Sequence, residues 1–174
     1  MDNNLKVIIK SKEVENKVTE IGKEISLDYK GKDLVLISVL RGSVYFAVDL
    51  SRKLTIPFVL DFISISRYGE KSDSTGIVRI TKDLDVNIAH KHVLVIEDIV
   101  DTGLSLSYLL RNLKTRNPES LKVCTLLNVA ARRIVDVPIH YKGFDLPDIF
   151  VVGYGLDHNE NYRNLLHIAE YKRE

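Results

Sequence analysis

The sequence has no tryptophan, one methionine and one cysteine among its 174 residues. The single cysteine, Cys124, cannot form a disulfide within the chain, so nothing in the sequence requires an oxidising compartment. With 4 prolines and 9 glycines, the composition is unlike that of collagen-type or low-complexity chains. The hydrophobic fraction of 45% is instead typical of a globular protein with a core, and the length fits a single domain over residues 1–174.

The chain also lacks a strong net charge and long apolar segments. Its 25 Lys and Arg residues against 24 Asp and Glu residues give a formal charge of +1, whereas proteins that grip nucleic acid nonspecifically are normally distinctly basic. No apolar stretch approaches the roughly 20 residues that cross a bilayer. Residues 1–6 lack the basic and apolar regions of a signal peptide. We therefore expect a soluble, cytoplasmic protein with neither a nucleic-acid nor a membrane partner.

Apolar runs and helical patterns alternate along the chain. Valine and isoleucine recur at spacings of three and four in residues 14–25, which predicts an amphipathic helix. Residues 34–40 form an apolar run rich in β-branched side chains, typical of a strand buried on both faces. Such alternation favours an α/β fold with a mainly parallel, twisted sheet flanked by helices. Similar patterns predict helices over 44–54 and 104–113 and strands over 58–65, 77–80, 93–96, 121–129 and 149–152.

Polar or small residues follow three of these strands, at 41–43, 97–105 and 153–157. Ligands of parallel sheets bind outside the carboxyl ends of the strands, so we expect the three segments to share one rim of the sheet. A polar stretch at 67–76 is long enough to close over that rim as a lid.

The most informative segment is V-L-V-I-E-D-I-V-D-T-G-L-S at residues 93–105. The backbone amides of residues 102–105 are expected to point into a turn at the start of a helix, an arrangement that binds phosphate. Glu97 and Asp98 would repel phosphate, so they more plausibly hold a hydrated cation or sugar hydroxyls. Asp101 or Thr102 as a simple helix cap is the alternative. Three acidic residues beside an apolar strand are costly for capping alone, which favours a functional site.

This segment resembles the phosphoribosyl-diphosphate-binding motif of type I phosphoribosyltransferases. Further matches narrow the resemblance to the hypoxanthine-guanine phosphoribosyltransferase family: L-R-G-S at 40–43, S-T-G at 74–76 and G-F-D-L-P-D-I-F-V-V-G-Y-G-L-D at 143–157. The patterns G-x-x-x-x-G-K-[ST] and G-x-G-x-x-G of other nucleotide-binding proteins are absent. The resemblance implies the type I phosphoribosyltransferase fold, with a small base-binding hood from about residue 143 to 174, and assembly as a homodimer or homotetramer.

The same resemblance implies a reaction. A purine base displaces pyrophosphate from phosphoribosyl diphosphate, with Mg²⁺ as cofactor, and a nucleoside monophosphate forms. It also implies roles for residues: Asp101 exchanges a proton with purine N7, and Arg67 and Tyr68 belong to the lid. The implied binding residues are Glu97 and Asp98 for ribose and Mg²⁺, Asp157 for a second Mg²⁺, Thr102, Gly103, Leu104 and Ser105 for the 5′-phosphate, Arg41, Gly42 and Arg163 for pyrophosphate, and Ile99, Phe150 and Val151 for the base.

Two positions depart from the family pattern. Arg67 stands where the family usually has serine, which we expect to alter lid closure without abolishing it. Val129 stands where the family has a lysine that donates to the 6-oxo group of the base. A carbonyl left without a donor in a dry pocket costs on the order of 1–3 kcal/mol. We therefore expect a slight preference for adenine, and Asn128 would accept from its amino group if the amide faces the pocket.

Three alternatives stay open at the level of the sequence. Backbone groups or water could replace the lysine, so that hypoxanthine remains the substrate. The fold could serve a non-catalytic regulator that senses nucleotide, although 174 residues and a charge of +1 leave little room for a DNA-binding element. The acceptor could also be a base other than a purine.

Overall fold

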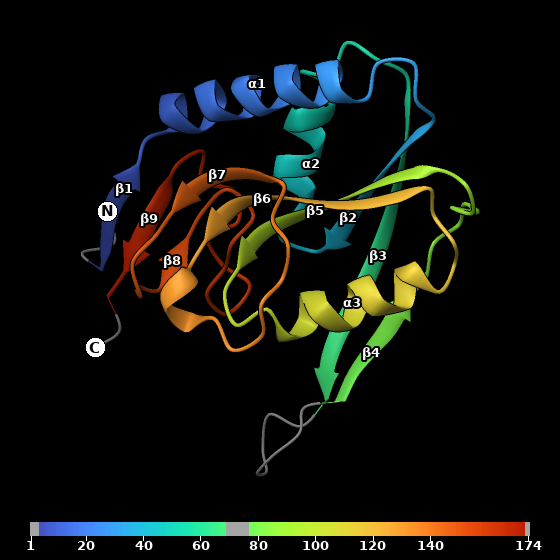
Figure 1. Cartoon of the computed structure of the whole chain (residues 1–174). Helices are drawn as coiled ribbons and strands as arrows, with labels where there is room; N and C mark the ends of the chain where they lie inside the picture. Colours follow the sequence, from blue (N-terminus) through green and yellow to red (C-terminus); the bar gives the residue numbers. More distant parts are fainter. Residues whose placement is uncertain (1–3, 69–76, 173–174) are drawn as a thin grey trace.

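The computed structural model describes residues 4–68 and 77–172, and it has the expected α/β architecture (Figure 1). A six-stranded sheet has the order β4-β3-β2-β5-β6-β7. All its neighbouring strands are parallel except β3 and β4, which are antiparallel. The strands are β2 (Leu34–Leu40), β3 (Phe58–Tyr68), β4 (Ile77–Lys82), β5 (His92–Val100), β6 (Ser120–Asn128) and β7 (Tyr141–Asp145).

Three helices cover the two faces of this sheet. In Figure 1, α1 (Ser11–Asp28) and α2 (Val44–Ser51) lie on one face, and α3 (Leu104–Lys114) lies on the other. The apolar positions of the predicted first helix, Val14, Val18, Ile21 and Ile25, are all buried in α1. Two apolar clusters result, one under α1 and α2 and one under α3. A single turn of 3₁₀ helix, Ala130–Arg132, follows β6.

The central strands match the predicted apolar runs, but several elements have different lengths. β2 is buried along residues 34–39, as a strand covered on both faces should be. β5 continues past the predicted end at residue 96 to Val100, so Glu97 and Asp98 lie within the strand and do not follow it in the sequence. They remain in the ladder because β6 pairs with β5 as far as Val100. α2 ends at Ser51 instead of residue 54, and β3 extends beyond residue 65 because β4 pairs with it.

A second, three-stranded antiparallel sheet joins the two ends of the chain. Its order is β1-β9-β8, with β1 (Leu5–Ile9), β9 (Ile168–Tyr171) and β8 (Val151–Val152). No sequence pattern predicted β1, β7 or β9. The hood was expected from residue 143, but residues 143–145 belong to β7 of the large sheet, and β1 comes from the opposite end of the chain. Figure 1 shows this sheet beside the β6–β7 edge.

The predicted lid lies partly outside the described residues. Arg67 and Tyr68 form the end of β3, where they pair with Val78 and Ile77 of β4. Residues 69–76, including S-T-G at 74–76, fall outside the described ranges. In Figure 1 the β3–β4 hairpin projects away from the body of the sheet. Within residues 4–68 and 77–172, no helix is long and apolar enough to cross a bilayer.

Candidate functional site

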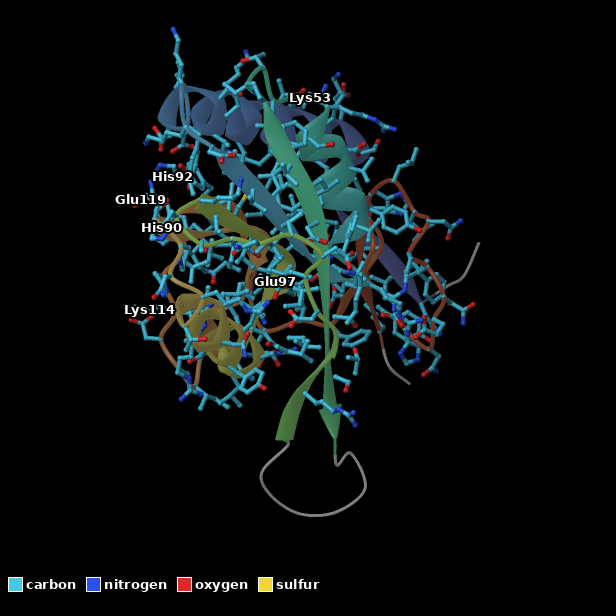
Figure 2. The ribbon with its side chains drawn as sticks, turned by 90° about the vertical axis from the view of Figure 1, so that its right-hand side faces the viewer. Lys53, His90, His92, Glu97, Lys114 and Glu119 are labelled. Atoms are coloured by element: carbon cyan, nitrogen blue, oxygen red, sulfur yellow. The ribbon has the colours of Figure 1, made fainter. Side chains whose placement is uncertain are left out.

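A cavity of about 400 Å³ opens at the carboxyl ends of β2 and β5. Three separate segments line it, as the sequence predicted: Arg41 and Gly42 after β2, residues 97–101 at the end of β5 with Gly103, Ser105 and Leu106 at the start of α3, and Asp157 with Arg163. Thr102 and Leu104, which the resemblance also implies for the 5′-phosphate, are not among the lining residues. Figure 2 shows Glu97 near the centre of the molecule, above the base of the β3–β4 hairpin. The third segment, however, follows β8 of the small sheet, so the shared rim is not formed by parallel strands alone.

Two glycines bring the third segment to the rim. Gly42 is buried, and a Cβ placed on it would overlap the carboxylate of Asp98 and stand 3.3 Å from the carbonyl oxygen of Gly155. Gly155 has φ +100°, and a Cβ there would overlap the carbonyl oxygen of Gly42. The two loops therefore touch backbone to backbone, which only residues without a side chain permit. The peptide bond between Leu40 and Arg41, just before Gly42, is cis.

Glu97 and Asp98 form a buried acidic pair. Among the described residues no group donates a hydrogen bond to the side-chain carboxylate of Glu97, whereas Asp98 Oδ1 accepts from the N–H of Ile99 at 2.8 Å. Burial, reinforced by the charges of Asp98 and Asp101, raises the pKa of Glu97 well above its usual value. Burial also raises the pKa of Asp98 to about 6, although the Ile99 N–H acts in the opposite direction. A cation or a hydroxyl donor that enters the cavity would stabilise the ionised form of this pair.

The carboxylates suit Mg²⁺ only as part of a shared coordination shell. Within the described residues, no group of three His, Cys, Asp or Glu side chains is placed to hold a metal ion. Asp157 is already engaged: its Oδ1 lies 2.8 Å from Nη2 of Arg163, and its Oδ2 accepts from the N–H of Glu160 at 2.9 Å. Mg²⁺ commonly takes one or two carboxylates and completes its octahedron with waters and substrate oxygens. Glu97 and Asp98 fit that role because they are acidic, adjacent and line the cavity.

The turn at residues 101–105 leads into α3. Gly103 occupies the N-cap of α3 with φ +79°, and Gly103 and Ser105 line the cavity. Two of the four amides expected to cradle phosphate already donate within the turn, and the shorter bond runs from the N–H of Thr102 to Oδ1 of Asp101 at 2.6 Å. The Leu104 N–H lies 3.4 Å from the hydroxyl oxygen of Thr102. Phosphate binding by all four amides would therefore require Asp101 to release Thr102.

Arg133 supports this turn and was missed as a site residue. Its Nε donates to the carbonyl oxygen of Asp101 at 2.8 Å, and its Nη2 donates to Asn128 Oδ1 at 2.6 Å and to the carbonyl oxygen of Val100 at 3.3 Å. The next two residues add to the support, because the N–H groups of Ile134 and Val135 both donate to the carbonyl oxygen of Thr102 at 3.0 Å. Residues 133–135, which follow β6, thus hold the end of β5 and the turn at residues 101–105 in place through hydrogen bonds to their carbonyl oxygens.

The side-chain amide of Asn128 is not available to bind the base. Its Nδ2 donates to Asp145 Oδ1 at 2.6 Å and its Oδ1 accepts from Arg133, so both ends of the amide are engaged. The sequence-based expectation that Asn128 accepts from adenine is therefore wrong for this arrangement. Val129 is fully buried, and its N–H donates to the carbonyl oxygen of Val100 at 2.9 Å.

Val151 begins β8, one of the two outer strands of the small sheet, and Phe150 directly precedes it, while Ile99 lines the cavity. The Phe150 ring makes edge contacts with His158 and Tyr171, at centroid distances of 5.7 Å and 6.2 Å. The N–H of Tyr171 donates to the carbonyl oxygen of Phe150, so the backbone of residue 150 faces β9. In an antiparallel ladder the next residue faces the other way. The N–H and C=O of Val151 therefore point to the outer edge of the small sheet.

The two arginines assigned to pyrophosphate share an acidic partner. Arg41 Nη2 lies 2.6 Å from Glu160 Oε1, and Arg163 Nη2 lies 3.2 Å from Glu160 Oε2. Arg163 also donates through Nη1 to the carbonyl oxygen of Gly155 at 2.7 Å. Glu160 belongs to no motif that the sequence analysis identified. The shared contact depends on two loops that are distant in the sequence.

A second, larger hollow of about 740 Å³ lies at the other end of the sheet. His90, Lys114 and Glu119 are among its lining residues, and Figure 2 shows these three at one side of the molecule, away from Glu97. His90 and His92 stand at the start of β5, whose carboxyl end holds Glu97. The chemistry implied by the sequence gathers in the smaller cavity, so we place the functional site there.

Comparison with known proteins gives consistent matches. The family described as phosphoribosyl transferase domain matches residues 6–159. A hypoxanthine-guanine phosphoribosyltransferase of Mycobacterium avium is 48% identical over 169 residues, covering 94% of this chain and 83% of that protein. A hypoxanthine phosphoribosyltransferase of Escherichia coli strain K12 is 42% identical over 172 residues, covering 98% and 97%. The crystal structure of a hypoxanthine phosphoribosyltransferase from Staphylococcus aureus superposes with a TM-score of 0.93 at 41% identity, covering 98% and 93%.

Proposed function

Because the chain belongs to the phosphoribosyltransferase family, we propose that it transfers a phosphoribosyl group from phosphoribosyl diphosphate to a purine base. The type I fold expected from the sequence is confirmed by the similarity to the Staphylococcus aureus enzyme. One observation carries the proposal: a single cavity gathers Glu97, Asp98 and Asp101 with the turn into α3 and with two arginines. The bond from ribose C1 to the diphosphate oxygen breaks, a bond from C1 to a purine nitrogen forms, and pyrophosphate leaves.

We propose a 6-oxopurine, hypoxanthine or guanine, as the acceptor. The relatives named above carry those names, and none of their names includes adenine, the base that Val129 suggested. The outward N–H and C=O of Val151 offer a donor and an acceptor to the edge of a base. Hypoxanthine presents an acceptor at O6 and a donor at N1, so such a backbone pair can bind it without the missing lysine. Phe150 supplies an aromatic face for the purine ring.

The residues of the cavity divide the work of this reaction. Glu97 and Asp98 are placed to accept from the ribose hydroxyls. Arg41 and Arg163 are placed to neutralise the leaving pyrophosphate, which leaves readily only when its charge is compensated. Mg²⁺ bound with the substrate would supply further compensation of that charge. Asp101 exchanges a proton with purine N7 once its carboxylate turns from the N–H of Thr102 toward the base.

A panel of bases tests the proposal. Purified protein is given phosphoribosyl diphosphate, Mg²⁺ and one base at a time, and pyrophosphate release and nucleotide formation are both measured. We expect turnover with hypoxanthine or guanine and far less with adenine, and an Asp101→Asn variant that folds but turns over much more slowly. Turnover confined to adenine, or to a base that is not a purine, would overturn the choice of acceptor. Nucleotide binding without turnover of any base would instead indicate a sensor.

Two other expectations, a homo-oligomer and a cytoplasmic location, stay predictions. The resemblance implies a homodimer or a homotetramer. Size-exclusion chromatography with light scattering would distinguish both from a single chain of 19.8 kDa.

A further inference from the structure

One carboxylate lies between the two guanidinium groups that the proposed function assigns to pyrophosphate. Glu160 uses its two oxygens separately, Oε1 toward Arg41 at 2.6 Å and Oε2 toward Arg163 at 3.2 Å. Among the described residues, Glu160 is the one acidic partner of Arg41. A carboxylate and a phosphate present the same kind of charged oxygen pair to a guanidinium. Glu160 therefore makes the contacts that an incoming diphosphate would need.

The backbone holds Glu160 in this place. Its N–H donates to Asp157 Oδ2 at 2.9 Å, and residues His158 and Asn161 pair across the same loop. The carboxylate is thus a tethered anion at the mouth of the site. Its side chain is 59% exposed and that of Arg41 is 69% exposed, so water is available to both groups once they separate. Ion pairs this exposed are weak and can be exchanged for another anion.

Arg163 does not need Glu160 to stay in position. Its Nη1 donates to the carbonyl oxygen of Gly155 at 2.7 Å, and its Nη2 lies 2.8 Å from Asp157 Oδ1. Neither contact involves the side chain of Glu160. The carboxylate of Glu160 is therefore better placed to occupy the anion site than to build it.

We propose that Glu160 is an internal competitor for the diphosphate group of the substrate and for the pyrophosphate product. Its ion pairs with Arg41 and Arg163 break when the anion binds and re-form when pyrophosphate leaves, and this competition sets the affinity of the site. This inference rests on the proposed function, because it takes the two arginines as the pyrophosphate site. It predicts that the wild-type affinity for pyrophosphate is lower than the arginines alone would provide.

The test is a titration of inorganic pyrophosphate, with Mg²⁺ present, into three proteins. Glu160→Gln keeps the length of the side chain and removes its charge. Glu119→Gln removes the same charge from an exposed residue beside the distant second hollow and controls for net charge. We expect Glu160→Gln to lower the Kd for pyrophosphate by about threefold to tenfold and to lower the KM for phosphoribosyl diphosphate in parallel. Glu119→Gln should leave both constants within about 1.5-fold of wild type.

The opposite sign would overturn the inference. If Glu160 organises the arginines instead of competing, Glu160→Gln will bind pyrophosphate with unchanged or weaker affinity. An equal increase in pyrophosphate affinity in Glu119→Gln would also contradict the inference, because the effect would then come from net charge. Pyrophosphate binding by none of the three proteins, together with no transfer to any base, would overturn the proposed function itself. Thermal melting of each variant establishes that the comparison is between folded proteins.

Discussion

Gly42 lies so close to Asp98 that a side chain at residue 42 would overlap the carboxylate oxygen Oδ2. Gly42 follows β2, and Asp98 lies on the neighbouring strand β5, so the contact joins the loop that carries Arg41 to the acidic pair. The carbonyl oxygen of Gly155 stands on the other side, 3.3 Å from the same position. Three separate segments thus meet at one glycine, and their spacing determines the geometry of the cavity.

We predict that Gly42→Ala damages activity far more than stability. The new methyl group must displace either Asp98 or the loop carrying Arg41, and a shift of about 1 Å in an active site can cost about 100-fold in rate. A drop in kcat/KM of roughly that size is expected in steady-state assays. Gly31→Ala is the control, because Gly31 has φ +74° and no atom within 4 Å of the added methyl. It should lose about 1 kcal/mol of stability through backbone strain and keep its activity.

The pKa of Asp98 predicts how stability varies with pH. Its folded value of about 6 exceeds the unfolded value of about 3.9. Between those values the folded protein keeps a proton that the unfolded chain has released, so the free energy of unfolding falls as pH rises. Glu97, whose pKa is also raised, acts in the same direction. For Asp98 the loss is on the order of 1–3 kcal/mol and is complete above about pH 6.

Asp98→Asn should remove this part of the pH dependence. We expect the ligand-free variant to be more stable than wild type at pH 7 to 8, and the difference to shrink as the pH falls toward 4. Urea unfolding at several pH values measures both proteins under the same conditions, so groups that do not interact with Asp98 cancel in the comparison. Glu97 does not cancel, because the charge of Asp98 helps to raise its pKa, and the substitution therefore also weakens the contribution of Glu97 to the slope. Parallel pH profiles for the two proteins would contradict the assignment of the slope to Asp98.

Much of the site could be predicted because its residues are adjacent in the sequence. The segment at 93–105 supplies the acidic pair, Asp101 and the turn that the sequence predicts to bind phosphate, all within one strand-to-helix connection. The buried strands could be read because β2 and the first half of β5 are apolar on both faces. The end of β5 could not be read, since acidic residues within a strand look like the polar residues that follow one.

The remaining features depend on contacts between distant parts of the chain. β1 and β9 are five and four residues long and pair across almost the whole sequence, so neither has a local signal of its own. Asn128 could be placed near the base only until its partners Asp145 and Arg133 were known. Glu160 and Arg133 likewise owe their roles to what they touch and not to a motif.

Arg133 is expected to position the turn at residues 101–105 without touching substrate. Its guanidinium donates to the carbonyl oxygens of Val100 and Asp101 and to Asn128, and a lysine ammonium cannot span three acceptors in this way. We predict that Arg133→Lys raises the KM for phosphoribosyl diphosphate about tenfold with a smaller change in kcat. The free energy of unfolding should fall by about 1–3 kcal/mol, because buried acceptors lose their donors.

The neighbouring arginine provides the control for Arg133. Arg132 forms an ion pair with Asp148 on the surface, and such pairs contribute at most about 1 kcal/mol. Arg132→Lys should therefore leave the KM for phosphoribosyl diphosphate near the wild-type value. If both lysine variants behave alike in steady-state kinetics, Arg133 has no special link to the turn.

Substitution of Val129 tests whether one side chain determines the affinity of the site for the base. Val129 is fully buried at the end of β6, next to a strand end that lines the cavity. A lysine there would add a charged donor for the 6-oxo group, and a hydrogen bond from a charged donor contributes about 1.5–3 kcal/mol. We therefore predict that Val129→Lys raises kcat/KM for hypoxanthine relative to adenine by at least tenfold. Without substrate the variant should be less stable than wild type, because its ammonium is buried unpaired.

Val129→Met separates the charge of the new side chain from its size. Methionine has a flexible stem similar to that of lysine and no donor, so it should change the ratio of hypoxanthine to adenine turnover by less than about threefold. Competition assays with both bases in one reaction measure the ratio directly. A methionine variant that gains as much as the lysine variant would mean that filling the space beside the base, not a hydrogen bond to O6, determines the preference.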